Sequence, residues 1–531
     1  MAVSSHPVAT RTSSVSTAGV LLAGVAVFAL SLALPWLRQD LGWLEVVAVA
    51  AALLAAGAMR GWRGEAAVLC SAALALSIAF HWAPKVLAES MQTGYEVGLL
   101  FTIPIVFWDA ARLAIPFWCA GRLVRDPRNA WLPAGLAAVA TEALIPGVFP
   151  WKLGYSQIGW PVMIQGADLF GPEWPTFALF ALAGLLVAVA APIVARFRGE
   201  PATSPVTAGG VAALVVTAAN VGYGVWALGH YDAVASSAAK AAVALVQVDP
   251  SHDDSLADLQ RLTRAACAAR PTPFDVVCWP ECAGGSYEEC LASFSDPDLI
   301  LKHSRDPGRG LRPLENPACP LLFGGKIYRG YPERPRELYQ SALLIDCRET
   351  MIGRYDKRHL MPFGEYVPGG DHFPQLRHYF PMENEFDVGR EATVLPCDDR
   401  VKLGVMLCYE DMVPEAARSL AVNSANLLVS LINGAAFTEP LTLVQHRLLA
   451  QLRAVECRRA FVRCAATGET CVIAPTGRIV ARLPLHVRDV LTAEVPLLEG
   501  VTVASRLGPA FPLACAAGVG LLALGGRRWR S

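Results

Sequence analysis

Charged residues are scarce in this sequence of 531 residues. They make up 17% of the chain, whereas hydrophobic residues make up 54%. This balance lies outside the usual range for a soluble globular protein, so we predict that part of the chain lies in lipid. The formal net charge of −1 provides no basic field that would attract nucleic acid, and no nucleic-acid partner is expected.

Motifs for cofactor binding are also missing from the sequence. The GGK segment that begins at Gly324 lacks the full spacing of a phosphate-binding loop. Four histidines show none of the spacings to cysteine or carboxylate that zinc sites use, namely His303, His359, His372 and His378. We therefore expect no nucleotide, no metal and no other cofactor.

Long hydrophobic runs are abundant. Five segments contain no charged residue and are close to the roughly 20 residues that a helix needs to cross a bilayer. They cover residues 15–37, 66–84, 174–195, 206–228 and 507–526. Weaker candidates with a few charges cover residues 41–59, 97–123 and 131–148. The sequence thus predicts about eight transmembrane helices, seven before one long polar segment and one after it.

The distribution of basic residues predicts an orientation. With the N-terminus inside, the cytoplasmic loops hold eleven Lys and Arg residues and the short outer loops hold three. We predict a membrane domain of seven transmembrane helices over residues 1–228, an outer domain over 229–506, and a last helix with a short basic cytoplasmic tail over 507–531. The first span is too long for a removable signal peptide, so we expect it to be retained.

Residues 229–506 carry a different pattern. Short apolar runs such as AAVALVQVD, PLLFGGKIY, VKLGVMLCYE and NLLVSLIN predict buried strands. Helix-like stretches lie between them at 255–269, 413–422 and 439–459, which favours a layered α/β domain. Eleven of the fourteen cysteines fall in residues 229–506. Because eleven is an odd number, at least one thiol stays free if the others form disulfides. Which cysteines would pair does not follow from the sequence.

Three polar residues at predicted strand ends could perform chemistry together: Glu281, Lys357 and Cys408. A cysteine nucleophile needs a base to take its proton and a positive group where an oxyanion forms. Each residue alone has an ordinary explanation, since a cysteine at a strand end is usually part of the core. The combination is what indicates a catalytic site.

The segments around these residues resemble the nitrilase or carbon-nitrogen hydrolase superfamily, whose members use a Glu-Lys-Cys triad on an α-β-β-α sandwich. The resemblance is closest to the apolipoprotein N-acyltransferase family, in YDKRHLMPFGEYVP and LCYED. FPWKLGYSQIGWP, at residues 149–161, resembles a loop between two membrane helices of that family. The resemblance implies a polytopic helical membrane domain joined to a nitrilase-like sandwich.

The resemblance also implies roles for individual residues. Cys408 would be the nucleophile, Glu281 the general base and Lys357 the cation beside the oxyanion. The backbone N–H of Tyr409 would be a further oxyanion donor. Positive charge near Cys408 is expected to raise the fraction of its thiolate form.

Supporting positions follow from the same comparison. Glu365 and Glu410 would orient Lys357 or handle a second proton. Tyr155 and Gln157 could hold a lipid headgroup, and Trp151 could lie at the membrane interface.

The segment INGAAF keeps Asn433 as a possible substrate contact but departs from the family pattern at Gly434 and Ala436. The helix that follows places Gln445 and His446 where they could line the site, although a helix with a satisfied polar face explains them equally.

The implied function is transfer of a fatty acyl chain from a phospholipid, through a cysteine thioester, to the N-terminal amine of a diacylglyceryl-cysteine lipoprotein. The implied location is the bacterial inner membrane, with the catalytic domain on the periplasmic side and the protein as a monomer. One alternative is a membrane-tethered amidase or nitrilase, in which water resolves the acyl-enzyme. Another is a non-catalytic relative that binds lipid or lipoprotein.

Overall fold

The computed structural model describes residues 17–56, 61–147, 149–197, 207–249, 255–281, 283, 286–289, 314, 317–329, 337–380, 385–434, 437 and 439–528.

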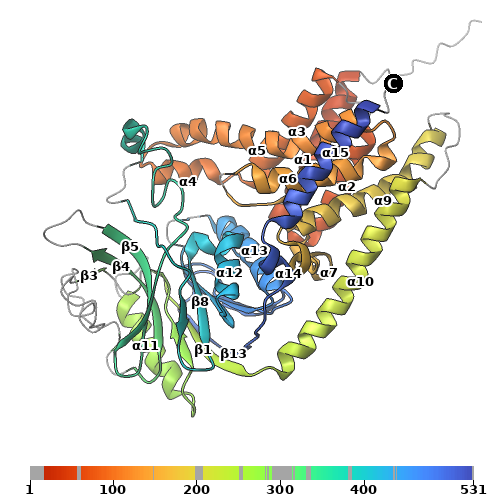
Figure 1. The fold of residues 1–531 in the computed structure, drawn as a ribbon. Helices are drawn as coiled ribbons and strands as arrows, with labels where there is room; N and C mark the ends of the chain where they lie inside the picture. Colours follow the sequence, from red (N-terminus) through yellow and green to blue (C-terminus); the bar gives the residue numbers. More distant parts are fainter. Residues whose placement is uncertain are drawn as a thin grey trace, which may run out of the picture.

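A bundle of helices forms one half of the molecule, and all eight predicted spans coincide with helices in it (Figure 1). They are α1 (Thr17–Leu37), α2 (Gly42–Ala56), α3 (Trp62–Ala79), α5 (Tyr95–Leu123), α6 (Trp131–Leu144), α9 (Trp174–Phe197), α10 (Ala208–Ser237) and α15 (Ala510–Arg528). Helix α10 runs past the predicted domain boundary and ends just before the first strand.

The helices differ in their capacity to cross a membrane. Within the described part of the chain, α3, α5, α9 and α10 are long and apolar enough, so four spans are clear where the sequence predicted eight. Helix α6 has 14 residues, which at 1.5 Å per residue covers about 21 Å and is shorter than the roughly 30 Å hydrocarbon core. Helix α2, with 15 residues, falls short for the same reason.

Short helical segments lie between the long helices of the bundle and at its junction with the sandwich. They are η1 (Gln39–Leu41), α4 (Ala83–Ser90), η2 (Pro127–Asn129), η3 (Leu153–Gly159), α7 (Pro161–Ile164), α8 (Ala167–Phe170) and α14 (Val503–Leu507). Proline at the first or second position of α4 and α7 suits a helix start, because a helix leaves its first N–H groups without acceptors in any case.

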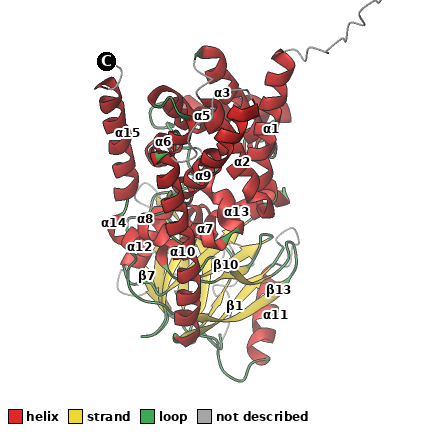
Figure 2. Ribbon diagram, turned by 90° about the vertical axis from the view of Figure 1, so that its right-hand side faces the viewer, coloured by secondary structure: helices red, strands yellow, loops and turns green. Residues whose placement is uncertain are grey.

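Two β-sheets form the other half of the molecule (Figure 2). One is a seven-stranded sheet of order β13-β1-β2-β4-β5-β6 in which β3 also pairs with β4, and the other is a six-stranded sheet of order β12-β11-β10-β9-β8-β7. The first contains β1 (Lys240–Gln247), β2 (Val276–Cys278), β3 (Ser286–Glu289), β4 (Leu321–Arg329), β5 (Glu337–Ile345), β6 (Met351–Asp356) and β13 (Asp489–Pro496). The second contains β7 (Val394–Pro396), β8 (Lys402–Leu407), β9 (Leu427–Asn433), β10 (Ala460–Ala466), β11 (Cys471–Ile473) and β12 (Ile479–Arg482).

The sheets pack face to face between two layers of helix. Alternate residues of β1 point to opposite faces, so Val243 and Leu245 join the core between the sheets, whereas Ala244 and Val246 pack toward α11 (Ser255–Ala268). Helices α12 (Pro414–Val422) and α13 (Pro440–Cys457) cover the other sheet. This arrangement is an α-β-β-α sandwich, as the sequence predicted for this part of the chain.

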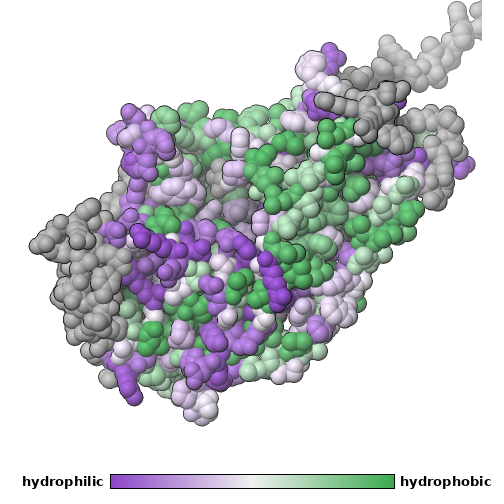
Figure 3. All heavy atoms as spheres, viewed as in Figure 1, coloured by the Kyte–Doolittle hydropathy of each residue, from purple (hydrophilic) through white to green (hydrophobic). Residues whose placement is uncertain are grey.

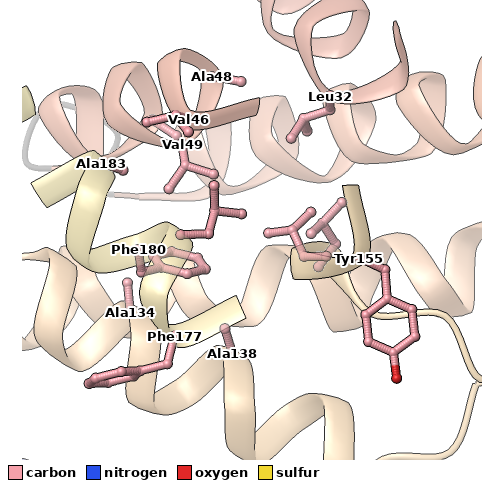
Figure 4. Packing of buried hydrophobic residues seen from close by; sticks show 14 of the residues in the cluster. Leu32, Val46, Ala48, Val49, Ala134, Ala138, Tyr155, Phe177, Phe180 and Ala183 are labelled. Atoms are coloured by element: carbon pink, nitrogen blue, oxygen red, sulfur yellow. The ribbon is translucent and has the colours of Figure 1, made fainter. Parts of the chain in front are cut away.

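Helix α13 lies between the sandwich and the helical bundle and is buried along almost its whole length. Its residues Leu448, Leu449 and Leu452 belong to the same hydrophobic core as α1, α2, α6 and α9. Figure 4 shows part of that core, in which Phe177 and Phe180 of α9 pack beside Ala134 and Ala138 of α6. The two halves therefore share one continuous apolar interface.

On the face shown in Figure 3, apolar side chains predominate over the bundle, whereas hydrophilic side chains are more frequent over the sandwich. Large exposed apolar residues include Val215, Val225 and Trp226 on α10 and Leu521 and Leu524 on α15. A continuous surface of this kind indicates contact with lipid. The chain is therefore a membrane protein with an attached α/β domain.

Candidate active site

The predicted catalytic residues come from strands of both sheets. Cys408 follows β8, Lys357 follows β6, and Glu281 lies three residues beyond the end of β2. Because β8 and β9 are parallel, Asn433 at the end of β9 lies at the same edge of the sheet as Cys408. The structure thus brings together side chains that are far apart in the sequence.

Lys357 is a buried cation held by two carboxylates. Its Nζ lies 2.6 Å from Glu365 Oε1 and 3.4 Å from Glu281 Oε1, and its side chain is 1% exposed. Burial alone would lower the pKa of Lys357, but Glu281 and Glu365 raise it well above its ordinary value. The ammonium group is therefore charged and fixed in position. Glu365 also accepts a hydrogen bond from the N–H of Met361 at 2.7 Å, so its carboxylate is held in place beside the lysine ammonium.

Glu281 is placed to accept a proton from Cys408. The carboxylate accepts a hydrogen bond, at 3.3 Å, from the backbone N–H of Asn433, and it lies close enough to Cys408 for each group to shift the pKa of the other. Burial raises the pKa of Glu281 above its ordinary value, and Lys357 opposes that rise. A carboxyl group whose pKa is moved toward neutrality is suited to general base and acid catalysis.

Cys408 occupies a strained turn between β8 and η7 (Cys408–Met412). Its φ of 47° lies in the left-handed region, which is costly for a residue with a side chain and occurs mainly at functional sites. Burial raises the pKa of Cys408 well above its ordinary value, and Glu281 adds to the rise. The expectation of a raised thiolate fraction is therefore wrong, because desolvation and a nearby carboxylate outweigh Lys357. The raised pKa favours the neutral thiol form of Cys408 in the resting site.

Tyr409 and Glu410 have different functions in the turn after Cys408. Tyr409 is the second residue of η7, where the first N–H groups of a helical turn have no acceptor inside the turn. This position suits a backbone oxyanion donor.

Glu410 is fully buried and accepts hydrogen bonds from the N–H of Leu407 at 2.9 Å, the N–H of Arg358 at 2.8 Å and the hydroxyl of Tyr355 at 2.7 Å. It therefore joins the segment after β6 to the turn after β8. In the described part of the chain, the carboxylates that pair with Lys357 are Glu281 and Glu365, not Glu410. Sequence reasoning missed its partner Tyr355, which is an ordinary buried strand residue by pattern.

Two narrow apolar cavities lead from the membrane helices to Cys408. One, of about 60 Å³, is lined by residues of α3, α4 and α5, and the other, of about 50 Å³, is lined by Cys408 itself. They share five wall residues, namely Phe80, Trp82, Phe149, Trp151 and Met361. The two cavities therefore adjoin along one apolar path.

A polar cavity of about 850 Å³ lies on the other side of the same wall. Trp151 and Pro362 each line both this polar cavity and an apolar cavity. Tyr409, the residue after Cys408, also lines the polar cavity. Its lining includes four cations and four carboxylates, namely Arg112, Lys152, Arg358, Arg377, Glu142, Asp371, Glu385 and Asp387. Apolar and polar compartments thus meet next to Cys408.

The FPWKLGYSQIGWP segment contributes mainly to structure. Trp151 is buried, with ring centroids 5.7 Å from Trp36 and 5.9 Å from Phe80, so it walls the cavities and does not lie in a lipid-facing belt. The Tyr155 hydroxyl accepts a hydrogen bond from Arg453 at 3.0 Å, and Gln157 donates to the carbonyl of Gly42 at 3.0 Å. Neither Tyr155 nor Gln157 lines the cavities described above.

Helix α13 contributes polar groups whose placement the sequence left open. Gln445 and His446 line the cavity of Cys408, and both are also hydrogen-bonded. Gln445 accepts from the Trp82 indole at 2.9 Å, and His446 Nε2 lies 2.6 Å from Asp411 Oδ1. Both interpretations of these two residues therefore hold.

The INGAAF segment is described in part. Phe437 lines the cavity of Cys408, whereas Ala436 lies outside the described residues. A Cβ at Gly434 would lie 2.9 Å from the Leu443 side chain and 2.9 Å from that of Thr467, so glycine suits the close packing at this point.

Comparison with known proteins shows the family of the chain. Residues 242–502 match the model of the carbon-nitrogen hydrolase family, and residues 26–185 match that of the apolipoprotein N-acyltransferase N-terminal domain. An apolipoprotein N-acyltransferase of Geobacter metallireducens is 34% identical over 386 residues, which is 71% of this chain and 69% of the relative. One from Azotobacter vinelandii is 30% identical over 440 residues, which is 80% of this chain and 79% of the relative.

Among solved structures, an amidase from Nesterenkonia sp. aligns with a TM-score of 0.34 and 18% identity, over 50% of this chain and 93% of that one. The family matches, together with the long alignments to the two relatives, extend over both the helical bundle and the sandwich. This chain belongs to the apolipoprotein N-acyltransferase family, and it is an acyltransferase with a carbon-nitrogen hydrolase domain.

Proposed function

We propose that this protein transfers a fatty acyl chain from a phospholipid to the N-terminal amine of a diacylglyceryl-cysteine lipoprotein through a thioester on Cys408. The observation that carries this proposal is the meeting of apolar and polar cavities beside the nucleophile. A phospholipid needs both environments, one for its acyl chain and one for its headgroup. A small amide or nitrile needs neither a path into the membrane helices nor a second large compartment.

The first half-reaction uses three groups. The Cys408 sulfur attacks the ester carbonyl carbon while its proton passes to Glu281. The Nζ of Lys357 and the N–H of Tyr409 stabilise the oxyanion of the tetrahedral intermediate. When the intermediate collapses, the C–O bond breaks, and Glu281 returns the proton to the leaving lysophospholipid oxygen.

The second half-reaction repeats these steps with an amine. The lipoprotein amine attacks the thioester carbonyl, Glu281 takes a proton from the nitrogen, and collapse breaks the C–S bond. Glu281 then returns that proton to the Cys408 sulfur. The phospholipid ester supplies the driving force, so the cycle uses no nucleotide. The apolar walls formed by Trp82, Phe149 and Trp151 disfavour water as the acceptor.

The cavities also set a limit on how the substrate enters. Volumes of about 60 and 50 Å³ are much smaller than a fatty acyl chain, so wall side chains must move when the lipid binds. We propose that Phe80 and Met361, which border both apolar cavities, move to admit the chain. The headgroup would then lie in the polar cavity, whose basic and acidic residues could pair with a zwitterionic headgroup.

We further propose that eight helices cross a bacterial inner membrane and that the sandwich lies on the periplasmic side. The count of basic residues supports this orientation, because the proposed cytoplasmic loops hold eleven Lys and Arg residues and the short outer loops hold three. Helix α15 ends on the side of the bundle remote from the sheets, which is consistent with this orientation (Figure 1). The helices too short for a straight crossing would need local thinning of the bilayer. We propose that residues 1–228, 229–506 and 507–531 form the three parts of the chain, and that it acts as a monomer.

Mass spectrometry of the full-length protein tests the proposal. The wild type and Cys408→Ala are incubated with phosphatidylethanolamine in nanodiscs and then with a diacylated lipopeptide. We expect an acyl mass on Cys408 that is absent from the variant and passes to the peptide amine. Cys347→Ala, which removes an exposed cysteine of the same domain, serves as the control and should behave as the wild type.

Two results would contradict the proposal. Transfer of the acyl group to water alone, with the lipopeptide present, would make the protein a membrane-tethered hydrolase. Absence of any acyl mass with phospholipid, in a sample whose melting curve is normal, would favour a non-catalytic lipid-binding protein.

A further inference from the structure

Two cysteines outside the active site face each other across the outer layer of the sandwich. Cys267 lies near the end of α11, and Cys319 lies two residues before β4. Their sulfur atoms are 3.6 Å apart, although the residues are separated by 52 positions in the sequence. Cys319 is 2% exposed in the core between α11 and the seven-stranded sheet, and Cys267 is partly exposed at the edge of that core.

The two thiols are chemically unequal. The hydrogen bond from Cys319 lowers the pKa of Cys267 to about 7, and the same contact raises the pKa of Cys319. The lowered pKa favours the thiolate form at Cys267, which is also the more accessible of the two cysteines. Cys267 is suited to attack an external disulfide, and the buried Cys319 is suited to resolve the product.

We propose that Cys267 and Cys319 form a disulfide bond in the mature protein. The inference rests on the periplasmic placement of the sandwich proposed above, because that compartment oxidises thiols whereas the cytosol keeps them reduced. It does not depend on the acyl-transfer mechanism, since neither cysteine lines the cavities described for the active site.

The oxidant is a thiol–disulfide oxidoreductase in its disulfide form. The Cys267 thiolate attacks one sulfur of the oxidant's disulfide, which forms a mixed disulfide and releases the other sulfur as a thiolate. Cys319 then loses its proton and attacks the Cys267 sulfur, which releases the second oxidant thiolate. The two protein thiols lose two electrons and two protons in total, and the oxidant becomes a dithiol.

The cross-link would enclose the general base. Glu281 lies between the two cysteines in the sequence, and β2, which leads to it, pairs with β4 through Cys278 and Leu322. Joining α11 to the start of β4 closes this part of the chain into a loop. A closed loop has fewer unfolded conformations, so the bond is expected to stabilise the sheet edge that positions Glu281.

A third cysteine provides a matched control. Cys347 is exposed in the turn after β5, and its charge contributes to the raised pKa of Cys319, so the two lie within electrostatic range. If thiols in this region were oxidised without selectivity, Cys347 would compete for Cys319. The distance of 3.6 Å between the sulfurs of Cys267 and Cys319 favours that pair.

The test measures the thiol state of the full-length protein in cells. Cells are quenched with acid, all free thiols are blocked with N-ethylmaleimide, and the purified protein is digested for mass spectrometry with and without prior reduction. We expect a cross-linked peptide pair containing Cys267 and Cys319 that disappears on reduction. Cys347→Ser should leave this pair unchanged, whereas Cys267→Ser should leave Cys319 blocked as a free thiol.

Recovery of both Cys267 and Cys319 as N-ethylmaleimide adducts from unreduced wild type would overturn the proposal. A second readout uses stability. Reduction should lower the melting temperature of the wild type by several degrees and leave that of the Cys267→Ser/Cys319→Ser double variant unchanged. Equal shifts in the two proteins would also overturn the proposal. Acylation of Cys408 is measured on the same samples. If Cys408 is not acylated but the Cys267–Cys319 cross-link is present, the proposed acyl transfer has failed and the disulfide proposal stands.

Discussion

At the scale of single residues, the protonation states of the site follow from burial. Cys408 and Glu281 are both removed from water, and the pKa of each is raised because water no longer stabilises the charged form. Lys357 is equally buried, but two carboxylates hold its proton in place. The site therefore keeps a neutral thiol beside a base and a permanent cation.

This arrangement predicts how acylation depends on pH. Glu281 acts as a base in its deprotonated form, so the rate is highest above its pKa and falls as the pH drops through it. Because that pKa is raised, the fall begins at a higher pH than for an ordinary glutamate. The raised pKa of Lys357 means that its charge persists at alkaline pH. The rate of acyl-Cys408 formation from phospholipid, measured from acidic to alkaline buffer, checks both limits.

Glu281→Gln tests the assignment of the base. The variant should form the thioester roughly 100- to 10,000-fold more slowly, as is typical when a general base is removed, and the acidic fall in rate should disappear. Glu494→Gln, at an exposed ion pair with Arg270, is the control and should keep the wild-type profile. A variant that is slow but retains the same acidic fall would assign the titration to another group.

At the scale of elements, patterns of apolar residues predicted the helices and strands well. The uncharged runs became helices, and the short apolar runs around Val243, Val277, Leu322 and Val405 became strands. Predictions of span length were poorer, because Pro146 and Gly147 follow α6 and the chain leaves the helix before an apolar run would suggest. The contacts that fix one helix against another were not visible in the sequence.

Glycines in α10 illustrate such contacts and allow a paired test. A Cβ at Gly224 would lie 2.1 Å from the backbone carbonyl oxygen of Val162 in α7, whereas nothing lies within 4 Å of a Cβ at Gly222. Gly224→Ala should therefore destabilise the protein by about 1–3 kcal/mol through overpacking. Gly222→Ala should have no cost and could gain up to about 1 kcal/mol from helix propensity. Thermal unfolding of the full-length protein in nanodiscs measures both, and equal effects would refute close α7–α10 packing.

At the scale of the whole molecule, one buried arginine links the bundle to the sandwich. Arg458, just after α13, donates to Asp168 of α8 at 2.8 Å and to the Gln165 side chain at 2.7 Å. Its guanidinium carbon also lies 4.0 Å from the centroid of the Tyr231 ring on α10. The Arg458 side chain of the sandwich therefore contacts α8, the residue that follows α7, and α10 in the helical half.

Arg458→Met is expected to weaken this junction. It leaves the Asp168 carboxylate, which is 3% exposed, without its cation, and an unpaired buried charge typically costs about 3–5 kcal/mol. Arg478→Met is the control, because its pair with Asp232 is 50% and 44% exposed and such pairs contribute about 0–1 kcal/mol. Denaturant or thermal unfolding of the two variants gives the comparison. Equal stabilities would show that the junction does not depend on Arg458.

The sequence by itself determined the two-part architecture and predicted Glu281, Lys357 and Cys408 as the candidate catalytic residues. The architecture and the candidate residues can be predicted from local sequence. Uncharged apolar runs indicate helices in contact with lipid, and short motifs at strand ends indicate reactive side chains. Only the tertiary structure showed how close these residues lie to one another and how burial shifts their pKa values. It also showed that Glu410 hydrogen-bonds to both the segment after β6 and the turn after β8. It also decided that Tyr155 and Gln157 are structural and that Cys267 lies beside Cys319. These properties depend on distances and burial between segments far apart in the chain, and packing alone sets those distances.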